Sequence, residues 1–500
     1  MRIRLVVNIL ILAGSLFPYE TLFPLFRRTA LAGVQAVPNS VLRNGTWFKL
    51  GVVESRIYRL DYEFFQKAGI DIASLDPKTI KIFGNGCFML PQVNNVGRYE
   101  DLSEKRIYVG GEADGRFDVG DYILFYGQSP HLLALTENNG TASISYQHNL
   151  YSDTAFYFLT FGDQAGIRVE VEGATGTGLP RITSFDELAA HEADLTNILG
   201  SGREWYGEKF DLQREYSFNI DIPGVVQNSI IRLVSSVMGQ SYSPSSMDIT
   251  INDYPLGSQT IDPIPDANYA LRGQNRIDSF SVNTDLVSNP EVINLSFRFN
   301  KALSGNSVAY LNYFILQSRR ELAYRNEQVM FRSVESLQYP ECEFVVKSPA
   351  NGMKVWDITN PLEPTEVLTT ISDGELIFGS PTSSLRTFIL FDPDEAGMPV
   401  SLQKIPNQDL HGEEAPDFLI ITHDRFRQQA WRIAGLRSEL NGLNSQVVTT
   451  SEIYNEFSSG AQDVTAIRDY IRYLWEKAGR TKPGYVLLFG KGTFDYKGRI

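Results

Sequence analysis

The hydrophobic pattern of this 500-residue chain changes character near Pro416. Before that residue, short runs rich in Tyr, Phe, Val and Ile alternate polar with apolar positions and are bounded by Gly, Pro, Asn or Asp, as half-buried β-strands are. After it, continuous apolar runs such as "DFLIIT" and "YVLLFG" alternate with helical patterns. Such alternation is typical of a parallel sheet that is buried on both faces. The sequence therefore predicts a multidomain protein with β-rich domains in front of an α/β domain.

The β-rich part is predicted to contain three segments. Residues 37–171 form a β-rich N-terminal domain with one short helix near "EFFQKAGI", where Gly69 can end the helix. Residues 172–346 carry six strand patterns at near-regular spacing, which favours a β-sandwich or jelly roll. In residues 347–412 the strand patterns shorten and Pro and Gly become more frequent, which indicates a small β extension and a linker.

The α/β segment, residues 413–500, is predicted to begin with a strand over "DFLIIT" and a helix behind it that ends at Asn441 and Gly442. One face of that helix carries Phe426, Ala430, Ile433 and Leu440. A second helix is predicted to begin after Asp463, a good N-cap, and to end at Gly479. Its apolar face carries Val464, Ile467, Ile471, Leu474 and Ala478.

"YVLLFG" supplies a third strand to this segment, which makes three strands and two helices in the prediction. Sheets average about five to six strands, so we expect the rest of the domain to lie outside these 500 residues. We also expect the segment to expose the open edge and faces of a half-built sheet.

Charge and cysteine content narrow the classes of function. The chain has 45 Lys and Arg against 59 Asp and Glu, a net charge of −14, and no basic cluster that would neutralise a phosphate backbone. A nucleic-acid partner is therefore not expected. Its two cysteines, Cys87 and Cys342, lie far apart and form neither a disulfide framework nor a metal-type CxxC spacing. Both are predicted to be buried thiols.

The first 36 residues have the order of a secretory signal peptide. Arg2 and Arg4 precede an apolar run, Leu5–Phe17, which is too short to span a bilayer. We expect export and cleavage after Ala36; the alternative is an uncleaved amphipathic anchor. No later stretch approaches the roughly 20 apolar residues of a transmembrane helix.

Several stretches of the chain resemble a known family. They are "PDFLIITHDRF", "TSEIYNEFSSGAQDVTAIRDYIRYLWEKA" and "YVLLFGKGTFDYKG", with "VWDITNP" and "NQDLHG" upstream. They are similar to the gingipain-type cysteine peptidases, specifically to the sortase of the Bacteroidetes type IX secretion system, over nearly the whole mature chain. The resemblance implies a caspase-like α/β peptidase domain whose catalytic His and Cys lie downstream of the last quoted stretch. No residue here inherits a catalytic role, and Lys491 stands where many relatives are expected to have an acidic residue.

The function implied by this resemblance is that of the N-terminal part of a secreted cysteine peptidase. Such an enzyme removes the C-terminal sorting domain of exported cargo and passes the acyl group to a surface acceptor, for example an anionic lipopolysaccharide. Its partners would be outer-membrane components of type IX secretion and cargo with sorting domains, at the surface of a Gram-negative bacterium. Two alternatives stay open: a non-catalytic β-rich binding or assembly module at the outer membrane, and a plain gingipain-like secreted protease.

The residues themselves offer few candidates for chemistry. A Cys/His nucleophile requires a thiolate beside an imidazole, and neither cysteine has a recognisable local arrangement with the histidines. The five histidines are His131, His148, His191, His411 and His423. His423 follows a strand at the edge where open α/β sheets bind ligands, but capping of the next helix is the favoured interpretation. Asp495 could line a cleft, although an Asp in "GTFDYKG" more often makes a turn.

Metal and phosphate motifs are weaker still. Asp114, Asp118 and Asp121 in "GEADGRFDVGD" could be considered for calcium, but their spacing is not that of an EF-hand, and a solvated turn is favoured. The "GNG" of 84–86 and the "GKG" of 490–492 are too short for phosphate loops and are interpreted as tight turns. The sequence therefore identifies no certain cofactor, and calcium stays an open alternative.

Overall fold

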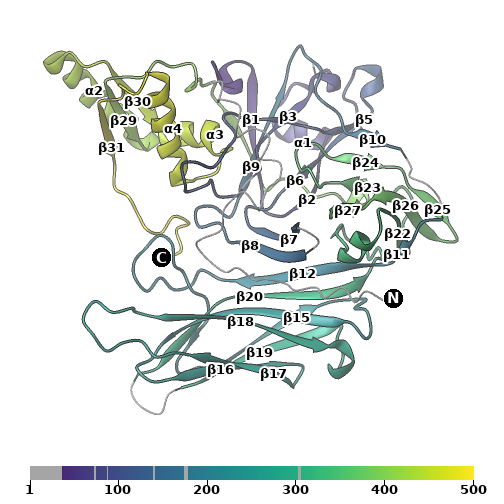
Figure 1. Cartoon of the computed structure of the whole chain (residues 1–500). Helices are drawn as coiled ribbons and strands as arrows, with labels where there is room; N and C mark the ends of the chain where they lie inside the picture. Colours follow the sequence, from purple (N-terminus) through teal and green to yellow (C-terminus); the bar gives the residue numbers. More distant parts are fainter. Residues whose placement is uncertain (1–36, 73–74, 87, 139–140, 174–177, 302–305) are drawn as a thin grey trace.

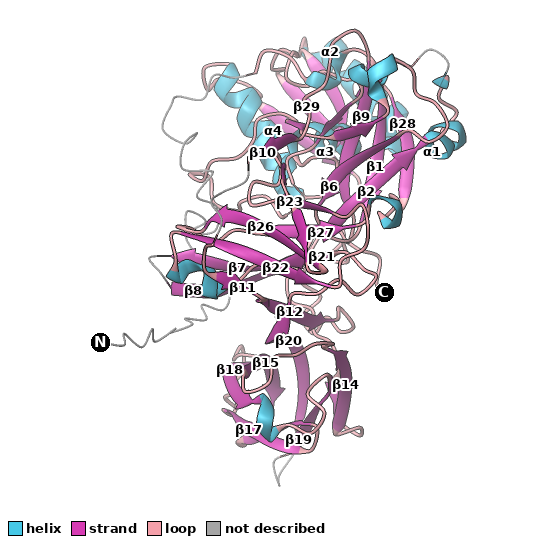
Figure 2. Ribbon diagram, turned by 90° about the vertical axis from the view of Figure 1, so that its right-hand side faces the viewer, coloured by secondary structure: helices cyan, strands magenta, loops and turns pink. Residues whose placement is uncertain are grey.

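The computed structural model describes residues 37–500 apart from 73–74, 87, 139–140, 174–177 and 302–305. The predicted signal peptide, residues 1–36, and Cys87 lie outside the described residues. Within them, no helix has the length and apolar character needed to cross a membrane. Strands dominate, and three of the four α-helices of the described residues lie in the C-terminal α/β segment, as Figures 1 and 2 show.

The N-terminal domain packs a five-stranded sheet on a three-stranded one. The first has the order β28-β1-β9-β3-β4, formed by β28 (Ser401–Ile405), β1 (Thr46–Val52), β9 (Ala155–Phe161), β3 (Lys81–Phe83) and β4 (Glu104–Lys105). The second consists of β2 (Arg56–Asp61), β6 (Tyr122–Gly127) and β5 (Tyr108–Gly110). A hairpin of β7 (Leu132–Asn138) and β8 (Thr141–Gln147) extends from it. The predicted short helix is α1 (Tyr62–Lys67), and Gly69 follows it in the left-handed conformation at φ 68°.

A second β-sandwich is entirely antiparallel and lies at the bottom of Figure 1. One sheet has the order β12-β20-β15-β18, formed by β12 (Ser184–Glu192), β20 (Val308–Glu321), β15 (Ile230–Gln240) and β18 (Gln274–Asn283), with β13 (Lys209–Phe210) also paired to β20. The other consists of β14 (Glu215–Asp221), β19 (Val292–Asn300), β16 (Ser245–Ile251) and β17 (Tyr254–Ile261). Alternate residues such as Met247, Ile249 and Ile251 enter the shared core, as the period-two pattern predicts.

The strands after residue 347 do not form a separate unit. One sheet combines β10 (Glu170–Glu172), β24 (Thr365–Val367), β23 (Lys354–Asp357), β27 (Phe388–Phe391) and β21 (Val329–Phe331). Its companion combines β11 (Arg181–Ile182), β22 (Glu341–Lys347), β26 (Glu375–Pro381) and β25 (Thr370–Ser372). These strands share one core, and β28 returns to pair with β1. The pairing therefore groups 347–412 with earlier segments, because strand partners are chosen by non-local packing that spacing along the chain does not reveal.

The C-terminal segment is a parallel sheet with helices, as predicted. Its order is β30-β29-β31, with β30 (Ser445–Thr449), β29 (Phe418–Thr422) and β31 (Tyr485–Phe489). The helices are α2 (Arg427–Asn441), α3 (Thr450–Phe457) and α4 (Val464–Lys477). The sequence prediction had two helices and missed α3.

The predicted helix faces are only partly correct. In α2, Ala430 is buried as expected, but Phe426 and Leu440 are exposed. Asp463 caps α4 as expected, its side chain accepting from the N–H of Thr465 at 2.7 Å. The buried residues of α4 are Thr465, Ala466, Asp469, Tyr470 and Leu474, so only Leu474 of the predicted face is fully buried. The buried face of α4 includes Tyr470 in place of most of the predicted residues, because α4 packs on α3 as well as on the sheet.

Candidate functional site

The carboxyl ends of the three parallel strands meet at one edge of the sheet. Thr422 ends β29 and is in register with Thr449 of β30 and Phe489 of β31. The buried Thr422 hydroxyl donates to the carbonyl of Phe489 at 2.8 Å, which ties the central strand to the edge strand. Open α/β sheets bind ligands in the loops beyond such an edge. We therefore take these loops as the candidate site.

The loop after β29 is occupied by structural contacts. His423 is the N-cap of a 3-10 turn, and its Nδ1 accepts from the N–H of Arg425 at 3.2 Å, which confirms the capping interpretation. The Asp424 carboxylate accepts from the hydroxyl of Ser451 at 2.6 Å. In this arrangement His423 is an exposed helix cap.

The loop after β30 is short because α3 begins at once. Thr449 and Glu452 form a capping box. The Thr449 side chain accepts from the backbone N–H of Glu452, and the Glu452 carboxylate accepts from the backbone N–H of Thr449 at 2.8 Å. The pattern Thr-x-x-Glu at 449–452 is the sequence signal that could have revealed this helix. Arg427 of α2 also forms an ion pair with Glu452, which joins the two loops.

The segment after β31 leaves the sheet and crosses to the other domains (Figure 1). Asp495 accepts from the N–H of Ile500 at 2.8 Å, as the turn interpretation predicts. Hydrogen bonds from the backbone N–H groups of Arg499 and Ile500 hold the pKa of the Asp495 carboxyl below its usual range. Lys491 is exposed. The segment then brings Lys497 to the β domains.

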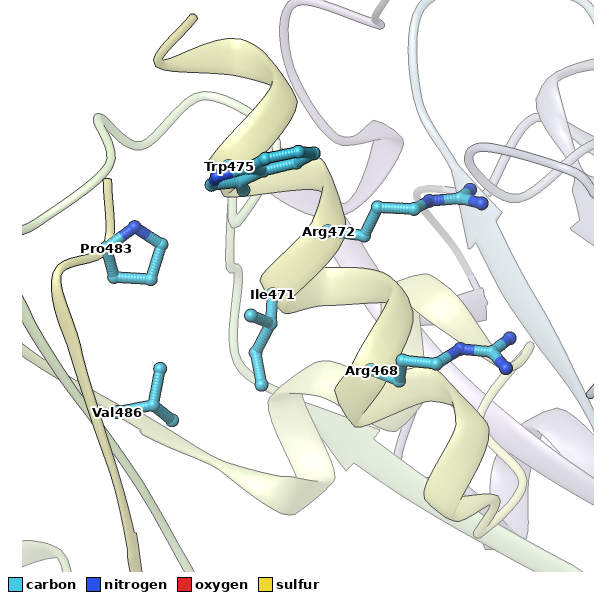
Figure 3. Close-up of a pocket in the computed structure, with 6 residues that line it drawn as sticks. All are labelled: Arg468, Ile471, Arg472, Trp475, Pro483 and Val486. Carbon is cyan, nitrogen blue, oxygen red and sulfur yellow. The ribbon is translucent and has the colours of Figure 1, made fainter. Parts of the chain in front are cut away.

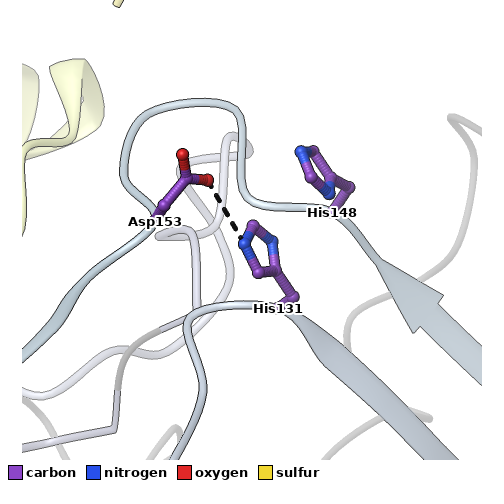
Figure 4. A group of neighbouring side chains, drawn as sticks. All are labelled: His131, His148 and Asp153. Carbon is purple, nitrogen blue, oxygen red and sulfur yellow. Dashed lines mark ion pairs between the residues drawn. The ribbon is translucent and has the colours of Figure 1, made fainter. Parts of the chain in front are cut away.

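Lys497 enters a cluster of titratable side chains that the sequence did not predict. The rings of His131 and His148 stack with centroids 4.3 Å apart (Figure 4). His131 Nε2 lies 3.3 Å from Asp153 Oδ1, and His148 Nε2 lies 3.0 Å from Asp194 Oδ2. Lys497 Nζ lies 2.8 Å from Asp153 Oδ1 and 3.1 Å from Asp194 Oδ2. The cluster joins the N-terminal domain, the second sandwich and the C-terminal segment.

The electrostatics of this cluster favour charged carboxylates. Although burial alone would raise it, hydrogen bonds from His131 and Lys497 hold the pKa of the Asp153 carboxyl well below its usual range. The pKa of Asp194 is likewise lowered, because His148 and Lys497 outweigh burial. Burial lowers the pKa of His131, and together with the charges of His148 and Lys497 it outweighs the hydrogen bond to Asp153, which acts to raise that pKa. Both carboxylates are therefore ionised at neutral pH.

The remaining histidines and the described cysteine do not form a catalytic pair. His191 lies 3.0 Å from Glu208. His411 is fully buried, and its Nδ1 lies 2.6 Å from Glu456 Oε2. Cys342 of β22 is buried in the core shared by the sheets that contain β22 and β27, where burial raises the pKa of its thiol to about 11. A thiol with that pKa is a poor nucleophile at neutral pH.

The calcium candidates form a turn. Asp121 accepts from the N–H of Asp118 at 2.7 Å, and Asp114 accepts from the N–H of Arg116 at 3.0 Å. In the part of the chain that the structure describes, the side-chain groups with metal-type spacing do not include these three carboxylates.

A shallow pocket of about 280 Å³ lies between α4 and β31 (Figure 3). Its lining residues are Arg468, Ile471, Arg472, Trp475, Pro483 and Val486. The guanidinium groups of Arg468 and Arg472 point away from the strand and donate to the carbonyls of Pro91 and Asn94. The pocket is therefore an apolar surface without a group that could carry chemistry.

Two comparisons with known proteins, one of sequence and one of structure, indicate the class of protein. Residues 411–500, which contain the parallel sheet and its helices, match the sequence model of peptidase family C25. Over 93% of its length the chain has the fold of PorU from Porphyromonas gingivalis, which was crystallised as a latent dimer. The similarity has a TM-score of 0.78 at 25% identity and covers 93% of this chain and 43% of that one. The chain is thus PorU-like: β-rich, with a C25 peptidase domain beginning at its C-terminal segment.

Other similarities are much weaker. A carbohydrate-binding module solved with calcium and xylotriose has a TM-score of 0.17 at 10% identity, covering 27% of this chain and 99% of that one. An insecticidal delta-endotoxin of Bacillus thuringiensis has a TM-score of 0.19 at 11% identity, covering 49% and 42%. Neither value supports an argument about fold or function. None of the curated proteins matches the chain in sequence.

Proposed function

We propose that these 500 residues are the N-terminal part of a secreted cysteine peptidase of the type IX secretion system, which processes the C-terminal sorting domain of exported cargo. The observation that carries the proposal is the coincidence of two findings. The C25 match falls on the parallel α/β segment, and the PorU fold extends through the β domains in front of it.

The nucleophile and base are proposed to lie on later strands of the same sheet, beyond Ile500. The chain spans 43% of the PorU structure, so most of that protein has no counterpart here. Within the described residues, Cys342 is buried in a different core from the strands of the parallel sheet, and the ends of these strands carry capping and turn residues. The loops after Thr422, Thr449 and Phe489 would then form one wall of the substrate cleft.

A thiolate is suited to the proposed reaction. It attacks the peptide carbonyl, expels the sorting domain as the amine leaving group and leaves an acyl-enzyme. An amine on a surface acceptor then resolves the thioester in place of water. The β domains would present outer-membrane partners and cargo to this site.

The test compares two proteins on one substrate. The substrate is a peptide that spans a sorting-domain junction, supplied with and without an amine acceptor. We expect no cleavage by the 500-residue chain, because losing the nucleophile removes orders of magnitude in rate. We expect cleavage that is sensitive to thiol alkylation from the protein encoded when the reading frame is followed past the codon for Ile500.

The products separate the alternatives. An amide with the added amine supports the sortase, whereas the free acid alone would identify a plain gingipain-like protease. Absence of a downstream His and Cys would leave the assembly module. Cleavage by the 500-residue chain that is lost on Cys342→Ala would refute the proposal and place the active site in the β domains.

A further inference from the structure

The cluster around Lys497 has the composition of a metal site. His131, His148 and Asp153 bring their ligand atoms within 4.8 Å of one another, and so do His148, Glu192 and Asp194. The Lys497 ammonium lies among them, 3.0 Å from His148 Nε2, 2.8 Å from Asp153 Oδ1 and 3.1 Å from Asp194 Oδ2. A lysine nitrogen contacting one imidazole and two carboxylates occupies the position that a cation would take.

We propose that His148, Asp153 and Asp194 form a binding site for a divalent transition metal such as Zn²⁺, and that the Lys497 ammonium and the metal compete for it. The donor set decides the class of metal. Calcium takes six to eight oxygen ligands, whereas an imidazole nitrogen with carboxylates suits zinc and its neighbours. Glu192, which accepts from the Tyr146 hydroxyl at 2.6 Å, supplies a further carboxylate within reach.

The hydrogen bonds of His131 assign it an orienting role. Its Nδ1 accepts from the backbone N–H of Asn149 at 3.0 Å. In a neutral imidazole the other nitrogen then carries the proton, so Nε2 donates to Asp153. His131 therefore holds this carboxylate in place, as outer partners of metal ligands do, and the metal is bound through His148.

Charge balance explains why the two cations exclude each other. Asp153 and Asp194 face Lys497 and Arg499, whose guanidinium lies 2.8 Å from Asp153 and 3.1 Å from Asp194. The side chains of Lys497 and Asp194 are only 6% and 5% exposed. If the segment left, the carboxylates of Asp153 and Asp194 would lose the counter-charges of Lys497 and Arg499, and one divalent ion could take their place. Metal binding and docking of residues 491–500 are thus linked in opposite directions.

The test measures zinc affinity in the full chain, expressed without a polyhistidine tag. Lys497→Met removes the competing charge and keeps the aliphatic stem. Lys491→Met, on the same segment but exposed, is the matched control. We expect isothermal titration with zinc chloride to show at least about tenfold tighter binding by Lys497→Met than by the wild type or the control, equivalent to about 1.4 kcal/mol. Adding His148→Ala to Lys497→Met should abolish this gain.

Hydrogen exchange supplies a second readout. In the wild type, zinc should increase amide exchange across residues 491–500, and His148→Ala should not show the increase. Circular dichroism melting shows whether each variant is folded, and Arg499→Met, with the same expected direction, replaces Lys497→Met if that variant is not. Equal zinc affinity in the charge-removing variant and the control, or a gain that survives His148→Ala, overturns the proposal. The outcome does not depend on peptidase activity.

Discussion

The α3 and α4 side of the parallel sheet is buried, whereas β31 and α2 are largely exposed, although both regions have apolar sequences. On the side of α3 and α4, the C-terminal segment packs against the N-terminal domain, and its core includes Leu90 from that domain. On the side of β31, Tyr485 and Leu488 are 64% and 65% exposed, and on α2 Leu440 is 67% exposed. "FLIIT" of β29 is buried throughout, whereas "YVLLF" of β31 is not. The apolar pattern shows what a strand can bury, and the neighbours decide what it does bury.

Polar contacts as well as apolar ones hold the α3 and α4 side, hereafter the docked side, against the N-terminal domain. Lys49 of β1 donates to Asn455 Oδ1 at 3.1 Å and to the carbonyl of Gly460 at 2.6 Å. Asp463 accepts from the N–H of Leu90 at 2.8 Å. The expectation of a half-built sheet with open faces therefore holds for β31 and fails for the α3 and α4 side.

The largest effect is expected at Glu456, on the docked side. Its carboxylate accepts from the N–H of Leu410 at 2.9 Å and from Gln408 Nε2 at 2.8 Å, and it pairs with the buried His411. Glu456→Ala should lower the free energy of unfolding by about 3–5 kcal/mol, because it leaves a buried partner unpaired. Urea unfolding measures the loss. The exposed Glu439→Ala is the control, and a loss equal to that of the control would contradict the prediction.

Burial of Leu474 is the next test of the comparison. Leu474 of α4 is fully buried, so Leu474→Ala should cost about 2–5 kcal/mol through lost transfer energy and a cavity. Leu440→Ala removes the same atoms from the exposed side and should change stability by less than about 0.5 kcal/mol. Thermal and urea unfolding of both variants give the two values. Similar losses in both would mean that the two sides are not different in solution.

The pH dependence of the unfolding free energy should test the docked side through the buried His411–Glu456 pair. Burial opposes the charge on His411, but the hydrogen bond and charge of Glu456 prevail and raise the pKa of His411. Its contribution to stability is therefore complete below the ordinary histidine value of about 6.5 and is lost as pH rises through the raised value. One group changes the unfolding free energy by at most about 1.4 kcal/mol per pH unit. Unfolding from pH 6 to 9 should show this slope, and a slope unchanged in His411→Asn would disprove the assignment.

The smallest effect on stability is expected at β31. Leu488→Lys should change the unfolding free energy by less than about 0.5 kcal/mol, since the side chain is already exposed. It should however reduce self-association, because a charge on an open edge strand opposes edge-to-edge pairing. Sedimentation velocity at several concentrations measures this. Strong destabilisation would show that the strand is covered in solution.

The sequence alone determined the features that are encoded locally. Residue types at fixed spacing predicted the three strands and two of the three helices after Pro416. They also predicted the cap at Asp463, the turn at Asp495 and the cap at His423. The family resemblance on "IYNEFSSG" and the neighbouring stretches also identified the PorU-like architecture, which the fold comparison and the C25 match support.

Only the tertiary structure decided the features that depend on distant partners. Strands from 347–412 joined earlier strands, and α4 turned Tyr470 inward in place of its predicted face. His131, His148 and Lys497 met although more than 300 residues separate the histidines from the lysine. A period or a cap is set by a few neighbouring residues, whereas pairing, burial and side-chain clusters depend on which surfaces of the folded chain fit together.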